Sequence, residues 1–210
     1  DAGIKLSTFI GGWDLSFNYL YQYNNLPVLY QDSAAGPVVN INPEYERTHV
    51  IGGSFSNAFD DIVLRGEIGY FTDHYFVTDT VLVDRGIADS DELNYVLGLD
   101  WTGIEDVFIS GQLFQSWLPD HSSSIVRDEV DTTLTFLYRQ DFMYETLEAE
   151  VLIISNLNNG DGLVRPKVTY EWDSELTTWI GLDMFYGSEK GLYGQYTPND
   201  RIVAGFELAF

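Results

Sequence analysis

Apolar and polar side chains alternate along most of the chain, so that every second residue belongs to the same chemical class. Successive side chains of a β-strand point to opposite faces, and this pattern therefore predicts strands with one apolar and one polar face. Residues 13–22 show it most clearly: Trp13, Leu15, Phe17, Tyr19 and Tyr21 alternate with Asp14, Ser16, Asn18 and Gln22, and Leu20 is the one exception.

The alternation recurs often enough to predict about eleven strands. Their length is roughly that of a tilted strand that crosses a bilayer, about 9–11 residues. Two of them, 3–10 and 49–59, show the pattern less clearly. The expected strands are 3–10, 13–22, 49–59, 62–70, 93–101, 107–117, 130–139, 147–153, 164–172, 176–186 and 201–210.

Short and long connections alternate between these segments. The short ones are 11–12, 60–61, 102–104, 143–144 and 173–174. The long ones are 23–47, 73–91, 118–127, 156–162 and 187–200, which are polar, acidic and rich in Gly or Asn. Short periplasmic turns alternate with longer extracellular loops in bacterial outer-membrane barrels.

The ends of the apolar face separate two architectures that both alternate. A soluble β-sandwich would turn its apolar face into a dry core. Here Trp and Tyr gather near strand ends, as in the aromatic girdles at the two membrane interfaces. We therefore expect an all-β fold, a transmembrane antiparallel up-and-down β-barrel, with residues 1–210 as a single barrel domain and no separate soluble domain. The expected girdle residues are Trp13, Tyr23, Tyr70, Trp101, Trp117, Tyr138, Tyr170, Trp172 and Tyr186.

Composition narrows the picture further. No apolar run approaches the ~18 residues of a transmembrane helix. The chain carries 33 acidic and 10 basic residues, a formal net charge of -23, which argues against a nucleic-acid partner. The charge fits either a solvated acidic surface, the interpretation we favour, or a pore that attracts cations.

The number of expected strands is odd, and this predicts an incomplete barrel. The last strand of such barrels runs from the outside to the periplasm. Because successive strands alternate in direction, the first of eleven strands, 3–10, would also run toward the periplasm. Complete single-chain barrels have an even number of strands, and an unpaired edge in lipid costs several kcal/mol per backbone group. We expect the C-terminal part of a larger barrel, closed by missing N-terminal strands or by a second chain. A strand inside 23–47 is the alternative, although that segment contains Pro27, Pro37 and Pro43.

The last strand ends in Gly205, Leu208 and Phe210. This ending resembles the C-terminal assembly signal of bacterial outer-membrane proteins, although Val203 stands where that pattern prefers a polar residue. The segments Phe185-Tyr186-Gly187, Gly194-Gln195-Tyr196 and Asn199-Asp200-Arg201 resemble the ending of a proteobacterial porin-like family, domain of unknown function 1302. The similarity covers about the last 40 residues. It implies a channel or export role, and the larger size of family members implies further upstream strands.

If the aromatic side faces lipid, the alternate residues line the lumen. Nine acids and six bases give this wall a net charge of -3, and the remaining -20 lies in loops and turns. Such a wall indicates either a water-filled channel, in which the bases form a ladder facing acids, or charges that merely pair across strands. The expected lumen-lining residues are Lys5, Asp14, Arg65, Glu67, Asp100, Asp131, Arg139, Glu148, Glu150, Arg165, Lys167, Glu171, Asp183, Arg201 and Glu207.

Other chemistry has weaker support. The clusters 89–92 and 158–161 could bind divalent cations through oxygen ligands, but neither has the full spacing of a calcium loop, and we favour plain solvated loops. Asp73-His74 and Asp120-His121, the second followed by Ser122–Ser124, are the candidates for a hydrolase dyad or triad. No known catalytic motif accompanies them, and we expect no catalytic residue, metal or cofactor.

We therefore expect a porin-like channel of the Gram-negative outer membrane that passes or exports small solutes through a mixed-charge lumen. A structural or partner-binding barrel in a multiprotein complex is the alternative, and a barrel-embedded hydrolase is the third. The expected partners are outer-membrane lipid and lipopolysaccharide, the barrel assembly machinery, and the strands or chain that close the barrel.

Overall fold

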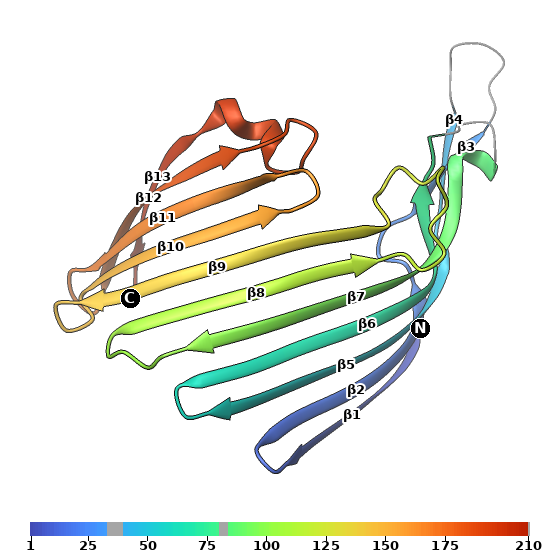
Figure 1. Ribbon diagram of the computed structural model, residues 1–210. Helices are drawn as coiled ribbons and strands as arrows, with labels where there is room; N and C mark the ends of the chain where they lie inside the picture. The colour runs from blue at the N-terminus through green and yellow to red at the C-terminus, as the bar shows by residue number, and fades with distance from the viewer. Residues whose placement is uncertain (33–39, 80–83, 210) are drawn as a thin grey trace. The chain divides into compact units, whose positions relative to one another are not determined.

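The chain folds into one large and one small antiparallel sheet (Figure 1). The computed structural model describes residues 1–32, 40–79 and 84–209. Phe210, the last residue of the expected assembly signal, lies outside these residues. The strands are β1 (Ala2–Ile10), β2 (Trp13–Tyr23), β3 (Val28–Asp32), β4 (Asn40–Glu44), β5 (Arg47–Phe59), β6 (Ile62–Val77), β7 (Ile87–Trp101), β8 (Val107–Trp117), β9 (Val130–Phe142), β10 (Leu147–Asn156), β11 (Asp161–Glu171), β12 (Leu176–Tyr186) and β13 (Arg201–Leu208).

The large sheet has eleven strands in the order β1-β2-β5-β6-β7-β8-β9-β10-β11-β12-β13. Each strand lies beside the next one of this sheet along the chain, which is the up-and-down order that the alternation of short and long connections predicts. The predicted all-β fold with eleven antiparallel strands is therefore confirmed. In the described part of the chain β1 and β13 pair on one side only and form the two edges of the sheet.

The segment 23–47 contains two strands that the sequence analysis did not separate from the loop. β3 and β4 pair with each other (Figure 1). Val28 lies opposite Glu44, and Leu29 lies opposite Pro43. Because they form their own two-stranded sheet, the large sheet keeps its odd number of strands.

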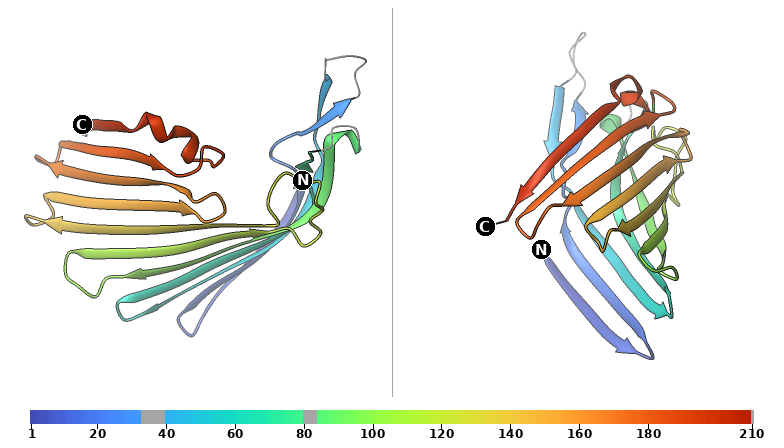
Figure 2. Two further views of the ribbon diagram at one scale, coloured as in Figure 1. Left: turned by 45° about the horizontal axis from the view of Figure 1, so that its top comes forward. Right: turned by 90° about the vertical axis from the view of Figure 1, so that its left-hand side faces the viewer.

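Helical structure is confined, in the residues described, to the short 3-10 segments η1 (Asp84–Gly86) and η2 (Gly194–Asn199). η2 lies against β12 (Figure 2). No helix in this part of the chain has the length and hydropathy to cross a membrane.

The connection predicted for 73–91 is shorter than expected, because β6 continues to Val77 and β7 begins at Ile87. Asp73 has a φ of 54°, a left-handed conformation inside the strand. Such a residue is typical of a β-bulge, which shifts the alternation of side chains by one position. His74 consequently lies on the same side as Phe71, and their rings stack with centroids 5.5 Å apart.

Residues of the chain form two compact units. Unit 1 contains Asp1–Ser56, Gly66–Tyr95 and Gln115–Asp131. Unit 2 contains Asn57–Arg65, Val96–Phe114 and Thr132–Phe210. Each site discussed below lies within one of them.

The register of the strands separates an apolar from a polar face. On β2, for example, Phe17 and Tyr19 lie opposite Gly53 and Ile51, whereas Ser16 lies opposite Ser54, with their hydroxyls 2.7 Å apart. The apolar face is open, and many of its side chains are at least 41% exposed. They are Ile4, Leu6, Phe17, Ile51, Ile68, Leu97, Leu99, Leu134, Phe136, Val168, Ile180, Ile202 and Phe206.

The buried apolar core is correspondingly small. In the described part of the chain it consists of Val28, Val50, Ile87, Val107, Leu118, Ile125 and Leu163. A soluble monomer seldom exposes a contiguous apolar patch larger than a few hundred Å². Many of the hydrophobic side chains of this sheet are therefore exposed instead of stabilising an interior.

A substitution at Gly162 tests how closely the sheet is packed beside its long connections. A Cβ at this position would approach the Ile154 carbonyl and the Tyr186 hydroxyl more closely than 3.0 Å. We expect Gly162→Ala to lower the free energy of unfolding by about 1–3 kcal/mol, because a backbone atom has to move. Gly111→Ala is the matched control, since a Cβ there meets nothing within 4 Å. Urea titration in detergent, followed by tryptophan fluorescence, measures both, and equal stability of the two variants would refute the packing.

Candidate functional site

Charged side chains line the polar face of unit 2, where strands β9 to β13 lie side by side. Glu150 lies opposite Arg139 on one side and Lys167 on the other, and Asp183 lies opposite Arg201. These alternate positions share one face because the register brings them to the same side of neighbouring strands. The ion pairs of this face are Arg65–Asp100 (3.1 Å), Arg139–Glu148 (3.7 Å), Lys167–Glu148 (4.0 Å), Lys167–Glu150 (3.6 Å), Arg165–Asp183 (2.6 Å) and Arg201–Asp183 (2.7 Å).

Asp183 is the most buried member of this network. Its side chain is 2% exposed, and its two oxygens accept hydrogen bonds from Nε of Arg165 and Nε of Arg201. A buried carboxylate needs such partners, because an unpaired charge out of water costs several kcal/mol. Two guanidinium groups are thereby held in fixed positions on one carboxylate.

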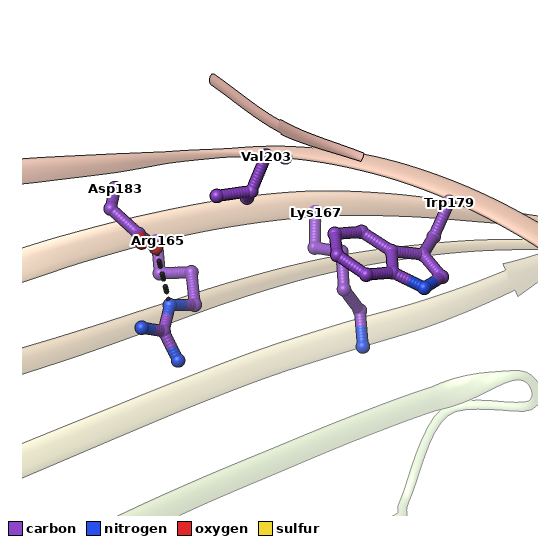
Figure 3. A pocket seen from close by; sticks show the side chains of 6 residues that line it. Arg165, Lys167, Trp179, Asp183 and Val203 are labelled. Carbon is purple, nitrogen blue, oxygen red and sulfur yellow. Dashed lines mark hydrogen bonds and ion pairs between the residues drawn. The ribbon is translucent and has the colours of Figure 1, made fainter. Parts of the chain in front are cut away.

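An open pocket of about 380 Å³ adjoins this network (Figure 3). It is lined by Arg165, Lys167, Trp179, Gly181, Asp183 and Val203. Trp179 lies opposite Gly205 in the register, so its indole stands on the polar face, among charged residues. Trp179 was not among the expected site residues, although its place in the alternation between Thr177 and Gly181 would have identified it.

A second cluster is centred on Glu92 on the polar side of unit 1. Oε1 of Glu92 accepts hydrogen bonds from the Arg127 guanidinium (2.6 Å) and the Ser116 hydroxyl (2.7 Å), and Oε2 contacts Nδ1 of His74. The Glu92 side chain is 6% exposed. His74 reaches it only because the bulge at Asp73 turns the imidazole to this side of β6.

Arg127 belongs to the β8–β9 connection, residues 118–129, which folds back beside β6 (Figure 1). On one edge of β6, the Val126 amide donates to the Val77 carbonyl, and the Asp79 amide donates to the Ser124 carbonyl. On the other edge, the Thr78 amide donates to the Gly86 carbonyl. The connection therefore passes from β8 to the far edge of β6. Arg127 of this connection binds Glu92, whose side chain lies on the polar side of the sheet, so the connection passes over that side. Leu118 and Ile125 of the connection are buried there.

A cavity of about 430 Å³ lies next to this connection. Segment 24–29, Thr48, Phe71, His74 and Ile87 contribute to its lining. Thr48 is 1% exposed and donates a hydrogen bond to the Thr72 carbonyl (2.7 Å). Leu20, the exception in the alternation, lies opposite the buried Val50 on this side. Apolar and polar side chains therefore both line this cavity of unit 1.

The β3–β4 hairpin is joined to η1 by polar contacts. Arg85 lies over the Tyr30 ring, 4.2 Å from its centroid, and pairs with Glu44 at 2.9 Å. The Tyr30 hydroxyl donates to Glu46 (2.8 Å). Burial, and then this hydrogen bond to a carboxylate, raise the pKa of Tyr30, so the phenol stays protonated.

Nine of the fifteen expected lumen residues take part in the ion pairs of unit 2. This arrangement agrees with the interpretation that the charges pair across strands. Lys5 and Asp14 are exposed on β1 and β2. That these residues line a lumen stays a prediction.

Three of the expected girdle residues illustrate how the ring and the polar atom of such a side chain are placed. Trp172 is 63% exposed, and its indole N–H donates to the Thr178 hydroxyl at 2.9 Å. Trp117 is 41% exposed and donates to Glu129 (3.4 Å). The Tyr138 hydroxyl donates to Gln140 (2.6 Å). An apolar body with a polar tip is the chemistry that suits a membrane interface.

The two acidic clusters are only in part the plain solvated loops that we expected, since residues 158–160 form an exposed turn. Residues 89–92 lie in β7, and Asp91 and Glu92 bind different partners: Asp91 accepts from Tyr70, and Glu92 contacts Arg127. Asp161 is fully buried, and its Oδ2 accepts hydrogen bonds from the amides of Tyr193 and Gly194 at the start of η2. Among the described residues, no group of three or more His, Cys, Asp or Glu side chains is placed to hold a metal ion.

The Asp-His pairs do not form the contacts of a dyad in this structure. His74 contacts Glu92, and Nε2 of His121 hydrogen-bonds the Arg127 carbonyl at 2.9 Å. The Ser122 hydroxyl hydrogen-bonds that of Ser124 (2.8 Å). Both imidazoles therefore hold the β8–β9 connection and its neighbours in place.

These features define an all-β protein with one large antiparallel sheet, apolar and open on one face and lined by paired charges on the other. The family described as "Protein of unknown function (DUF1302)" matches residues 1–210, and the chain belongs to that family. The match confirms the family resemblance and extends it from the C-terminal segments to the entire chain. No curated protein matches the chain.

The contact between Arg127 and Glu92 predicts how the β8–β9 connection is held. We expect Arg127→Ala to raise the rate of amide hydrogen exchange in residues 118–129 at least about tenfold, since Glu92 loses its cation and tenfold corresponds to about 1.4 kcal/mol. Lys190→Ala, in the connection before η2, removes the same charge elsewhere and should leave exchange in 118–129 unchanged. Equal exchange in Arg127→Ala and the unmodified chain would show that another contact holds the connection.

Proposed function

We propose that the protein is a porin-like channel of the Gram-negative outer membrane, and that this chain supplies an eleven-stranded part of the barrel wall. The observation that carries the proposal is the open apolar face combined with the charged face behind it. In water, an apolar face of this extent would be a site of aggregation. In a bilayer, hydrocarbon solvates it, and the hydrogen bonds between strands satisfy the backbone.

The direction of the edge strands supports a wall that further strands complete. With eleven antiparallel strands, β1 and β13 run in the same direction, so direct pairing between them would be parallel. An odd number of additional strands would restore antiparallel pairing and give an even total. We propose that upstream strands of the same protein, or a second chain, supply them, and that the barrel assembly machinery inserts the product among lipid and lipopolysaccharide.

The charges of the polar face support passage of small polar solutes. Bases and acids alternate across β9 to β13, so the wall carries local electric fields between neighbouring strands and only a small net charge. Charged rows of this kind set ion selectivity in pores. A channel of this kind passes or exports solutes that are small enough for the lumen and polar enough to hydrogen-bond with its charged side chains in place of part of their hydration shell.

The test is conductance in planar bilayers, where a channel gives stepwise current. The double variant Arg139→Ala/Arg165→Ala removes two positive charges from the polar face and leaves Glu148 and Asp183 with fewer partners. We expect its cation-to-anion permeability ratio to rise about twofold or more, since the local potential becomes more negative. The reversal potential in a salt gradient measures this ratio.

The matched control is Arg85→Ala/Lys190→Ala, which removes two positive charges from connecting segments. Its permeability ratio should change much less. Equal shifts in the two double variants would contradict a polar face that lines the pore, and absence of stepwise current from the unmodified protein would contradict the channel.

A further inference from the structure

The pocket of about 380 Å³ on the polar face of β11, β12 and β13 has a floor without a side chain. Gly181 lies between Trp179 and Asp183 at alternate positions of β12, and Lys167 and Val203 are its neighbours on the adjacent strands. Trp179 and Asp183 are four residues apart, which is about 13 Å along a strand. The pocket therefore extends from the Trp179 indole to Asp183 and the Arg165 guanidinium group bonded to it.

Trp179 is held in place by a glycine. A Cβ at Gly205 would lie 2.5 Å from Cζ2 of Trp179, so the indole rests directly on the backbone of β13. The ring is only partly buried, and the part that does not lie on Gly205 lines the pocket. A fixed, partly exposed indole among charges on a polar face is a stacking surface for another ring.

The polar groups of the pocket are hydrogen-bond donors. Both oxygens of Asp183 already accept from the Nε atoms of Arg165 and Arg201. The terminal nitrogens of Arg165 and the amino group of Lys167 point to the same side, away from Asp183 (Figure 3). The shortest ion-pair distance of the Lys167 amino group is 3.6 Å, to Oε1 of Glu150. A ligand that accepts hydrogen bonds, such as a carboxylate, matches these donors.

We propose that this pocket is a binding subsite for small solutes that carry an aromatic ring and a carboxylate group. The ring stacks on Trp179, and the carboxylate accepts hydrogen bonds from Arg165 and Lys167. A neutral sugar would also stack on an indole, but it needs acceptors as well as donors, and the one carboxylate that lines the pocket is already bonded. The proposal rests on the proposed channel function, because it names the class of solute that the polar face selects.

The test is equilibrium binding of 2-naphthoate to the full chain in detergent micelles, measured by calorimetry. We expect Trp179→Ala and Arg165→Gln each to weaken binding about tenfold. Val203→Phe should abolish it by filling the pocket while keeping every charge and the indole. Trp172→Ala is the matched control, since this indole belongs to the apolar face, and its affinity should equal that of the unmodified protein.

Three further ligands define the class. We expect 2-naphthalenemethanol, which lacks the charge, and propionate, which lacks the ring, to bind at least about tenfold more weakly than 2-naphthoate. Maltose should not bind. Equal affinity of the unmodified protein, Trp179→Ala and Val203→Phe for 2-naphthoate would overturn the subsite, and maltose binding that depends on Trp179 would overturn the ligand class.

Micelle binding separates this proposal from the channel itself. Stepwise current together with no specific 2-naphthoate binding would refute the subsite and leave the channel. Binding that follows the expected variant series without any current would support the subsite and refute the channel.

Discussion

The structure depends on one constraint: a sheet whose alternate side chains are apolar must find an apolar environment for that entire face. The described part of the chain supplies no second layer over it, since side chains such as Ile202 and Phe206 are 73% and 74% exposed and the buried apolar core has seven members there. The hydrophobic effect therefore acts between the protein and its surroundings more than within the chain. Backbone hydrogen bonds between neighbouring strands remain the internal interaction that orders the sheet.

The polar face of the sheet is organised differently in the two units. In unit 2 the charges of neighbouring strands pair with each other, and Asp183 orders two guanidinium groups beside an open pocket. In unit 1 the β8–β9 connection covers the polar side and buries Leu118 and Ile125 there, with Glu92 and Arg127 as its polar anchor. Within each unit, the connections and the ion pairs determine what a solute would meet.

The eleven strands of the large sheet and their up-and-down order were predictable, because period-two alternation is a local property of the sequence. The same alternation placed the charges on one face, but whether they pair was left as one of two alternatives. The β3–β4 hairpin was not, since its strands are five residues long and Pro43 lies inside one of them. The bulge at Asp73 was not predictable either, and it reverses the side on which His74 lies. The placement of Arg127 on Glu92, 35 residues apart in sequence, depends on how a loop folds back, which alternation does not encode. Trp179 could have been found from its position in the pattern, but aromatic residues were interpreted as belonging to the apolar face.

The most direct test asks whether the apolar face is solvated by hydrocarbon. The chain contains no cysteine, so single cysteines can be placed along β9 at 133–138 and spin-labelled in the protein reconstituted into lipid vesicles. If the apolar face lies in lipid, collision rates with oxygen, which dissolves in lipid, will peak at Leu134, Phe136 and Tyr138. Collision rates with a water-soluble nickel complex should peak at Thr133, Thr135 and Leu137. Equal accessibility of the two sets to the nickel complex would contradict the membrane-facing assignment and, with it, the channel.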